Sequence, residues 1–76
     1  MSITALDKVY EAVRASSDGL TREEIATMAD LPLQTVNPRV VELLDEGSLS
    51  EAGTFRKTAR GRNAKVLVTN AHMPAA

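Results

Sequence analysis

The sequence predicts an α+β domain in which three helices are followed by a two-stranded β-hairpin. Up to Gly47, apolar residues recur at helical spacing and are interrupted twice by turn signals. After Gly47, β-branched and apolar residues flank a short turn that contains Gly61, which is typical of a hairpin. The chain has 76 residues, so we expect one small domain. A chain of this size buries only about 60% of its unfolded surface, which makes the core marginal.

The first two helices are predicted in the segments 4–17 and 19–29. The first has apolar side chains in an i, i+3, i+4, i+7 stripe, at Leu6, Val9, Tyr10 and Val13. Gly19 is available as its left-handed C-terminal cap. The second helix opens with a T-x-x-E capping box formed by Thr21 and Glu24, and "DLP" at residues 30–32 ends it.

A third helix is predicted up to Gly47, but Pro38 lies within its pattern. A proline inside a helix removes one backbone hydrogen bond and costs about 3 kcal/mol or more. The residues therefore fit two arrangements: a turn over 32–36 that leads into a helix capped by Asn37, or one kinked helix. In both arrangements the exposed N-terminal end carries Gln34, Thr35, Asn37 and Arg39.

The hairpin is predicted from two runs with strand character. In "SLSEAGTFRKT", Leu49 and Phe55 have even spacing, so we expect them on one face with Phe55 buried, and we expect a bulge or a bend at Gly53. "AKVLVT" at residues 64–69 is the second strand, and "ARGRN" forms the tip. Residues 70–76 are predicted to be a disordered tail.

The net charge of −1 conceals a marked asymmetry along the chain. All ten acidic residues lie in residues 1–53, with only four lysines and arginines. Residues 54–76 carry five cations and no acid. Such segregation is typical of a face that binds a polyanion, and the alternative is that the two halves neutralise each other within the fold.

Three helices followed by a hairpin, in that order, form the winged helix arrangement. The sequence resembles the winged helix-turn-helix family of prokaryotic regulators over residues 3–69. "GLTREEIATMADLPLQTVNPRVVELLDEGSL" is similar to the helix-turn-helix unit, and "GRNAKVLVT" to the return strand of the wing. "TVNPR" followed by "RKTARGRNAKV" looks most like small phage-encoded members. The resemblance implies a domain over 1–69 that binds double-stranded DNA with its third helix in the major groove and regulates transcription.

The candidate contact residues have the chemistry that DNA requires. Arginine pairs with guanine and asparagine or glutamine with adenine, while a cluster of cations gains affinity by releasing counterions from the backbone. The "RGR" tip could place two guanidinium groups in a minor groove, or Gly61 could simply be a turn residue at a solvated tip. The free amides at the Thr21 helix start could also bind a phosphate, although Thr21 fits a structural cap better. The candidate DNA-binding residues are Gln34, Thr35, Asn37, Arg39, Arg56, Lys57, Arg60, Gly61, Arg62 and Lys65.

Other classes of function find little support. The chain has no cysteine, and its single histidine, His72, falls in the predicted tail. We therefore expect no enzyme activity, no metal and no cofactor. No apolar run approaches the roughly 20 residues of a membrane span, and the N-terminus does not resemble a signal peptide, so we expect a cytoplasmic protein.

A protein-binding adaptor that reuses the winged helix fold remains an alternative function. The ten acidic residues of the first part would repel DNA wherever they faced it, and Glu42 is expected on the exposed side of the third helix. RNA binding is a minor third option, because the hairpin offers only one aromatic ring for base stacking. The sequence does not predict whether the protein dimerises. Most such regulators bind paired half-sites, but this sequence shows no additional helix or heptad seam for self-association.

Overall fold

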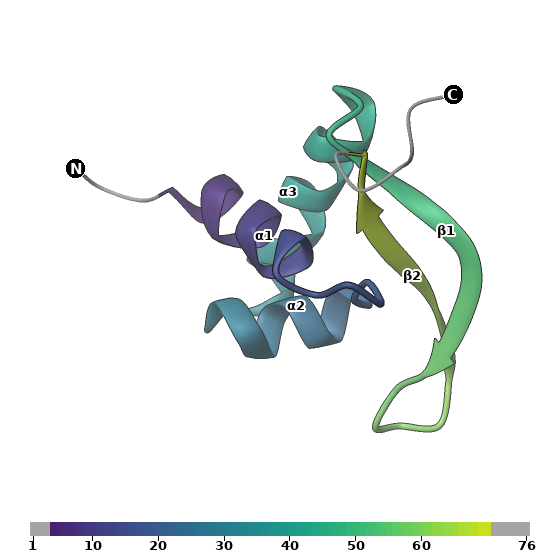
Figure 1. Cartoon of the computed structure of the whole chain (residues 1–76). Coiled ribbons are helices and arrows are strands. Elements are labelled where there is room, and N and C mark those ends of the chain that lie inside the picture. Colours follow the sequence, from purple (N-terminus) through teal and green to yellow (C-terminus); the bar gives the residue numbers. More distant parts are fainter. Residues whose placement is uncertain (1–3, 71–76) are drawn as a thin grey trace.

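The computed structural model describes residues 4–70 of the chain. Three helices precede a two-stranded antiparallel hairpin, which confirms the predicted α+β class and has the layout of a winged helix. The elements are α1 (Ala5–Arg14), α2 (Arg22–Ala29), α3 (Leu33–Asp45), β1 (Leu49–Lys57) and β2 (Asn63–Thr69). Figure 1 shows the helices gathered on one side, while the hairpin curves past them to a tip beyond α2.

The capping box predicted for α2 is present. The Glu24 backbone N–H donates to Thr21 Oγ1 at 3.3 Å, and the Thr21 backbone N–H donates to Glu24 Oε1 at 2.9 Å. The helix ends at Ala29, and its C-cap residue Asp30 adopts the left-handed conformation with φ 56°. The local sequence therefore defines both ends of this short helix.

The helix α3 runs continuously through Pro38, so the alternative with a helix beginning at Asn37 is wrong. Its N-cap position is Pro32, and Asn37 lies inside the helix, where it caps nothing. Pro38 is exposed, which leaves the Gln34 carbonyl without a helical partner on the solvent side. Water can hydrate this carbonyl, and hydration reduces the cost of the proline.

Gly19 does not cap α1, contrary to expectation. The helix ends at Arg14 with Ala15 as its right-handed cap, and Gly19 lies further on with φ +79°. The next residue, Leu20, forms an isolated antiparallel bridge with Leu67 of β2 through backbone hydrogen bonds of 2.8 and 3.0 Å. A Cβ on Gly19 would lie 2.6 Å from the Leu67 carbonyl oxygen. Glycine thus allows this segment to approach β2 closely.

The hairpin contains the irregularity predicted at Gly53, between Glu51 and Phe55 of β1. The expectation that Phe55 is buried is wrong, because its side chain is 61% exposed. Phe55 pairs with Lys65, in the outer part of the hairpin, whereas the buried residues of β2 begin at Val66. The outer hairpin therefore projects from the core.

The core lies where the three helices meet the inner half of the hairpin. Its members are Val9, Ala12, Val13, Leu20, Ile25, Val36, Val40, Leu43, Leu49 and Leu67. Residues 71–76, with His72, belong to the predicted tail and lie outside the described residues. Asn70 donates its backbone N–H to the Ser48 carbonyl at 3.1 Å and fastens the inner end of the hairpin. Within residues 4–70, no helix has the length and apolar character that crossing a membrane requires.

Candidate nucleic-acid interface

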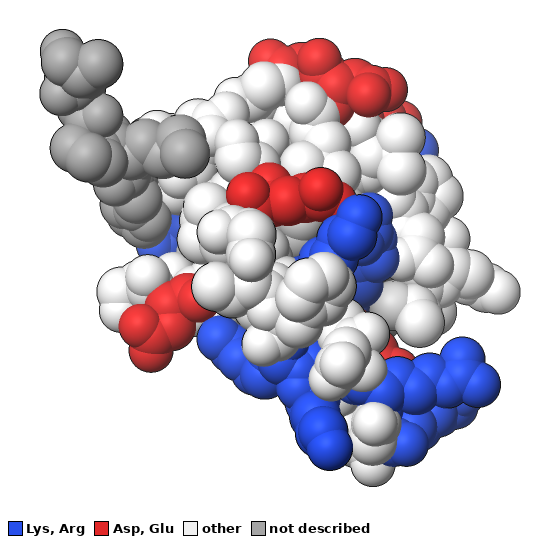
Figure 2. Space-filling model, turned by 90° about the vertical axis from the view of Figure 1, so that its right-hand side faces the viewer, with Lys and Arg blue, Asp and Glu red and all other residues white. Residues whose placement is uncertain are grey.

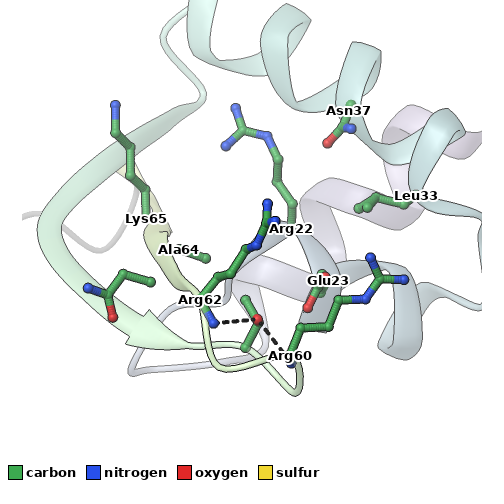
Figure 3. Close-up of a pocket in the computed structure, with 10 residues that line it drawn as sticks. Arg22, Glu23, Leu33, Asn37, Arg60, Arg62, Ala64 and Lys65 are labelled. Atoms are coloured by element: carbon green, nitrogen blue, oxygen red, sulfur yellow. Dashed lines mark hydrogen bonds between the residues drawn. The ribbon is translucent and has the colours of Figure 1, made fainter.

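A groove of about 310 Å³ lies between the hairpin and the N-terminal ends of α2 and α3 (Figure 3). Its charged lining consists of one acid, Glu23, and the four cations Arg22, Arg60, Arg62 and Lys65. The helix α3 contributes Leu33 and Asn37, which Figure 3 shows on the side of the helix that faces the hairpin. The groove therefore combines a cationic wall with one helix face.

The tip of the hairpin is held in shape by Thr58. Its Oγ1 accepts hydrogen bonds from the backbone N–H groups of Arg60 and Arg62, both at 3.3 Å, and its backbone N–H donates to the Arg62 carbonyl at 2.7 Å. Gly61 has φ +80° and nothing within 4 Å of a Cβ position, so its conformation serves the turn and its surroundings are open. In Figure 3 the Arg62 side chain extends toward Arg22, and the Arg60 side chain extends toward the Leu33 end of the groove.

Charge is segregated over the surface. Figure 2 shows lysine and arginine side chains gathered at the lower end of the molecule, where Figure 1 places the hairpin tip. The acidic side chains lie mostly in separate patches away from that end (Figure 2). Within residues 4–70, Arg22, Lys57, Arg60 and Arg62 form no ion pair, so their charge is available to a ligand.

Arg56 is engaged within the protein. Its Nη1 donates to Glu24 Oε1 at 2.5 Å, and its guanidinium also reaches the backbone carbonyls of Gly19 and Asp18, both at 3.4 Å. The hydrogen bond from Arg56 lowers the pKa of the Glu24 carboxyl, and the same bond raises the pKa of Arg56. Arg56 therefore acts as a strut between the hairpin and the start of α2.

Lys65 lies at the groove and is also paired, since its Nζ is 3.3 Å from Glu51 Oε2. Both side chains are about half exposed, and exposed pairs of this kind contribute about 0–1 kcal/mol. A phosphate can therefore compete with Glu51 for Lys65 at little cost.

Arg39 lies away from the groove. Its Nη2 donates to Glu42 Oε1 at 2.6 Å, and its Nε is buried without a hydrogen-bond partner. Residues on a helix are separated by about 100°, so Arg39 lies about 200° around α3 from Asn37. Glu42, which the sequence placed on the exposed side of α3, is the partner that holds it there.

The other sequence candidates divide between the two sides. Gln34 is exposed beside Asn37, and Thr35 is half-buried on the Arg39 flank. Lys57 is exposed and lines a second hollow of about 490 Å³ between α2 and the hairpin tip. At the start of α2, the capping box uses the Thr21 and Glu24 amides, while the amides of Arg22 and Glu23 are not part of the box.

Sequence reasoning missed Arg22 and Leu33 as groove residues. Arg22 was counted with the acidic part of the chain, yet it is the first residue of α2 and faces the hairpin. Its position directly after the Thr21 cap was a usable signal, because a helix start next to a wing lies close to any bound phosphate.

Comparison with known proteins gives no assignment: no family model matches the sequence, and no curated protein matches it. Among residues 4–70, no group of three histidine, cysteine or acidic side chains is placed to hold a metal ion. The function is therefore inferred from the geometry and charge of the groove.

Proposed function

We propose that this chain is a winged helix transcriptional regulator that binds double-stranded DNA through the groove and the hairpin tip. The observation that carries the proposal is the gathering of Arg22, Arg60 and Arg62 around one groove, where none of them forms an ion pair with another residue of the described range 4–70. Double-stranded DNA presents one negative charge per roughly 1.7 Å of its axis, and cations so placed release its counterions.

In this proposal α3 enters the major groove with the face that carries Leu33 and Asn37. The hairpin tip then follows the neighbouring backbone, where Arg60 and Arg62 contact phosphates or the minor groove. Arg56 contributes indirectly, because its bond to Glu24 fixes the hairpin beside α2. The protein acts in the cytoplasm of a prokaryotic cell, either as a host or as a phage product.

The direct test is a salt titration of binding to a fluorescently labelled duplex of mixed sequence, followed by fluorescence anisotropy. Four or five phosphate contacts give a slope of about −4 in a plot of log affinity against log salt concentration. A slope near zero, or no binding at low salt, would contradict the proposal.

A protein-binding adaptor is the second candidate, and exposed apolar side chains favour it. Phe55 is 61% exposed on the hairpin and Met28 is 57% exposed on α2. Large exposed apolar side chains are common at protein interfaces. Phe55→Ser should abolish capture of a partner in a pull-down if this candidate is right, and should leave the affinity for DNA unchanged if the DNA proposal is right.

A further inference from the structure

The exposed face of α3 offers an unusual set of side chains for a helix beside a cationic wall. Leu33, Asn37 and Val41 follow one another at one-turn intervals, and Gln34 lies next to Asn37. Leu33 is 40% exposed and Val41 is 49% exposed. These four positions provide two amides and two apolar side chains, and none of them is lysine or arginine.

The chemistry of that face matches one type of base pair. In the major groove, adenine offers an acceptor and a donor that an asparagine or glutamine amide pairs with bidentately, and thymine offers a methyl group for apolar contact. Guanine offers two acceptors, which favour arginine or lysine. We propose that α3 reads A·T base pairs, with Asn37 and Gln34 on adenine and Leu33 and Val41 on thymine methyl groups. This inference rests on the proposed DNA-binding function.

The arginine that could have read guanine is directed elsewhere. Arg39 is the only cation of α3, lies on the opposite flank from Asn37 and is bonded to Glu42. Turning it to the reading face would break that bond and leave the Glu42 carboxylate close to the DNA. The hairpin tip has a preference that agrees with A·T reading, because the Arg60 and Arg62 side chains favour the narrow minor groove of A-tracts.

The length of α3 sets the size of the site that it reads. Leu33 and Val41 are eight positions apart, which is about 12 Å along a helix. Successive base pairs are about 3.4 Å apart along the DNA axis. The four side chains therefore address about three or four consecutive base pairs, and we expect a short A·T run under α3.

The test begins with selection of bound sites from a random duplex library, using the full chain. The expected product contains a short A·T run. Each A·T pair is then replaced in turn by inosine·cytosine, which keeps the minor-groove pattern of A·T and presents the major-groove pattern of G·C. Reading by α3 predicts a loss of affinity of about 5- to 150-fold at the contacted pairs. Replacing thymine by uracil removes only the methyl group and should cost about fourfold at a contacted methyl.

Variants assign the effects to side chains. Asn37→Ala should remove the penalty for inosine·cytosine at one position, and Leu33→Ala should remove the penalty for uracil at another. Both residues are exposed on the helix surface, so circular dichroism should show folded variants. Arg39→Ala should leave the base preference of the selected site unchanged.

The outcomes separate this inference from the proposed function. If no duplex shows salt-dependent binding, both fail. If binding depends on salt but the selected sites are rich in G·C, or if inosine·cytosine is tolerated at every position, only the reading by α3 is overturned. Loss of a guanine preference in Arg39→Ala would also overturn it, since α3 would then read through its other flank.

Discussion

Replacing Arg22 by glutamine should remove one phosphate contact from the complex without weakening the fold. Arg22 is half-buried at the first position of α2, lines the groove and forms no ion pair within the described residues. Arginine and glutamine have similar helix propensities. A cation at a helix N-terminus opposes the helix dipole, so its removal should leave the free energy of unfolding unchanged or raise it by about 0.3–1 kcal/mol.

The size of the effect follows from the number of groove cations. Four contacts, one for each of Arg22, Arg60, Arg62 and Lys65, correspond to a slope of about −3.6 in log affinity against log salt. Between about 50 and 200 mM monovalent salt, affinity then falls about 150-fold in the wild-type protein. With three contacts the slope is about −2.7, and affinity falls about 40-fold over the same range.

Fluorescence anisotropy titrations at four or five salt concentrations measure both slopes. Arg14→Gln is the matched control, because it changes the net charge equally, and Arg14 lies on α1 in a pair with Glu11 outside the groove. The control should keep the wild-type slope. Equal changes in slope for the two variants would show that net charge governs binding and would refute the assignment of the groove.

Three further predictions concern stability, each measured by chemical denaturation. The pKa of Glu24 is lowered from 4.5 by its bond from Arg56, so its stabilisation is present above pH 4.5 and is lost as the pH falls through the lowered value. On acidification, the free energy of unfolding should therefore fall less in Glu24→Gln than in the wild type. If it falls equally in both proteins, the Arg56–Glu24 bond does not stabilise the fold. Pro38→Ala should stabilise the protein by about 1–3 kcal/mol, because α3 regains a backbone hydrogen bond; destabilisation would argue against a continuous helix. Gly61→Ala should lower the free energy of unfolding by about 1–2 kcal/mol, because alanine disfavours the positive φ at this position. Gly19→Ala should lower it by about 1–3 kcal/mol more, because the new Cβ would also clash with the Leu67 carbonyl oxygen. Equal losses for the two variants would contradict this clash.

Local sequence rules predicted the helices and their order, because the relevant interactions span only a few residues. The capping box joins Thr21 to Glu24 within one turn, and the apolar spacing of α1 depends only on helical geometry. Pro38 marks the limit of such rules. Its neighbours Val36 and Val40 are fully buried, and burying each contributes about 1.5–3 kcal/mol. Together these contributions match or exceed the cost of a proline in the helix, which is about 3 kcal/mol.

The parts of the candidate site that the sequence did not predict depend on distant contacts. Whether Phe55 is buried or exposed depends on how far the hairpin extends beyond the core. The even spacing within β1 predicts which residues share a face, but it does not predict where the core ends. Arg56 and Lys57 are adjacent and looked equivalent as DNA contacts. In the structure they have different roles. Arg56 binds Glu24, which lies 32 positions away in the sequence, whereas Lys57 is exposed.

The Glu24 carboxylate links the geometry of the helix start to that of the hairpin. Its Oε1 accepts hydrogen bonds from both the Thr21 backbone N–H at 2.9 Å and Arg56 Nη1 at 2.5 Å. Arg22 begins the same helix, and Arg62 lies on the same hairpin, so this oxygen and the Leu20–Leu67 backbone bridge together fix the position of one cation relative to the other. Held by these contacts, the two cations face one groove before any ligand arrives. The entropic cost of bringing the two cations together is therefore part of the free energy of folding, and it does not reduce the affinity for the ligand.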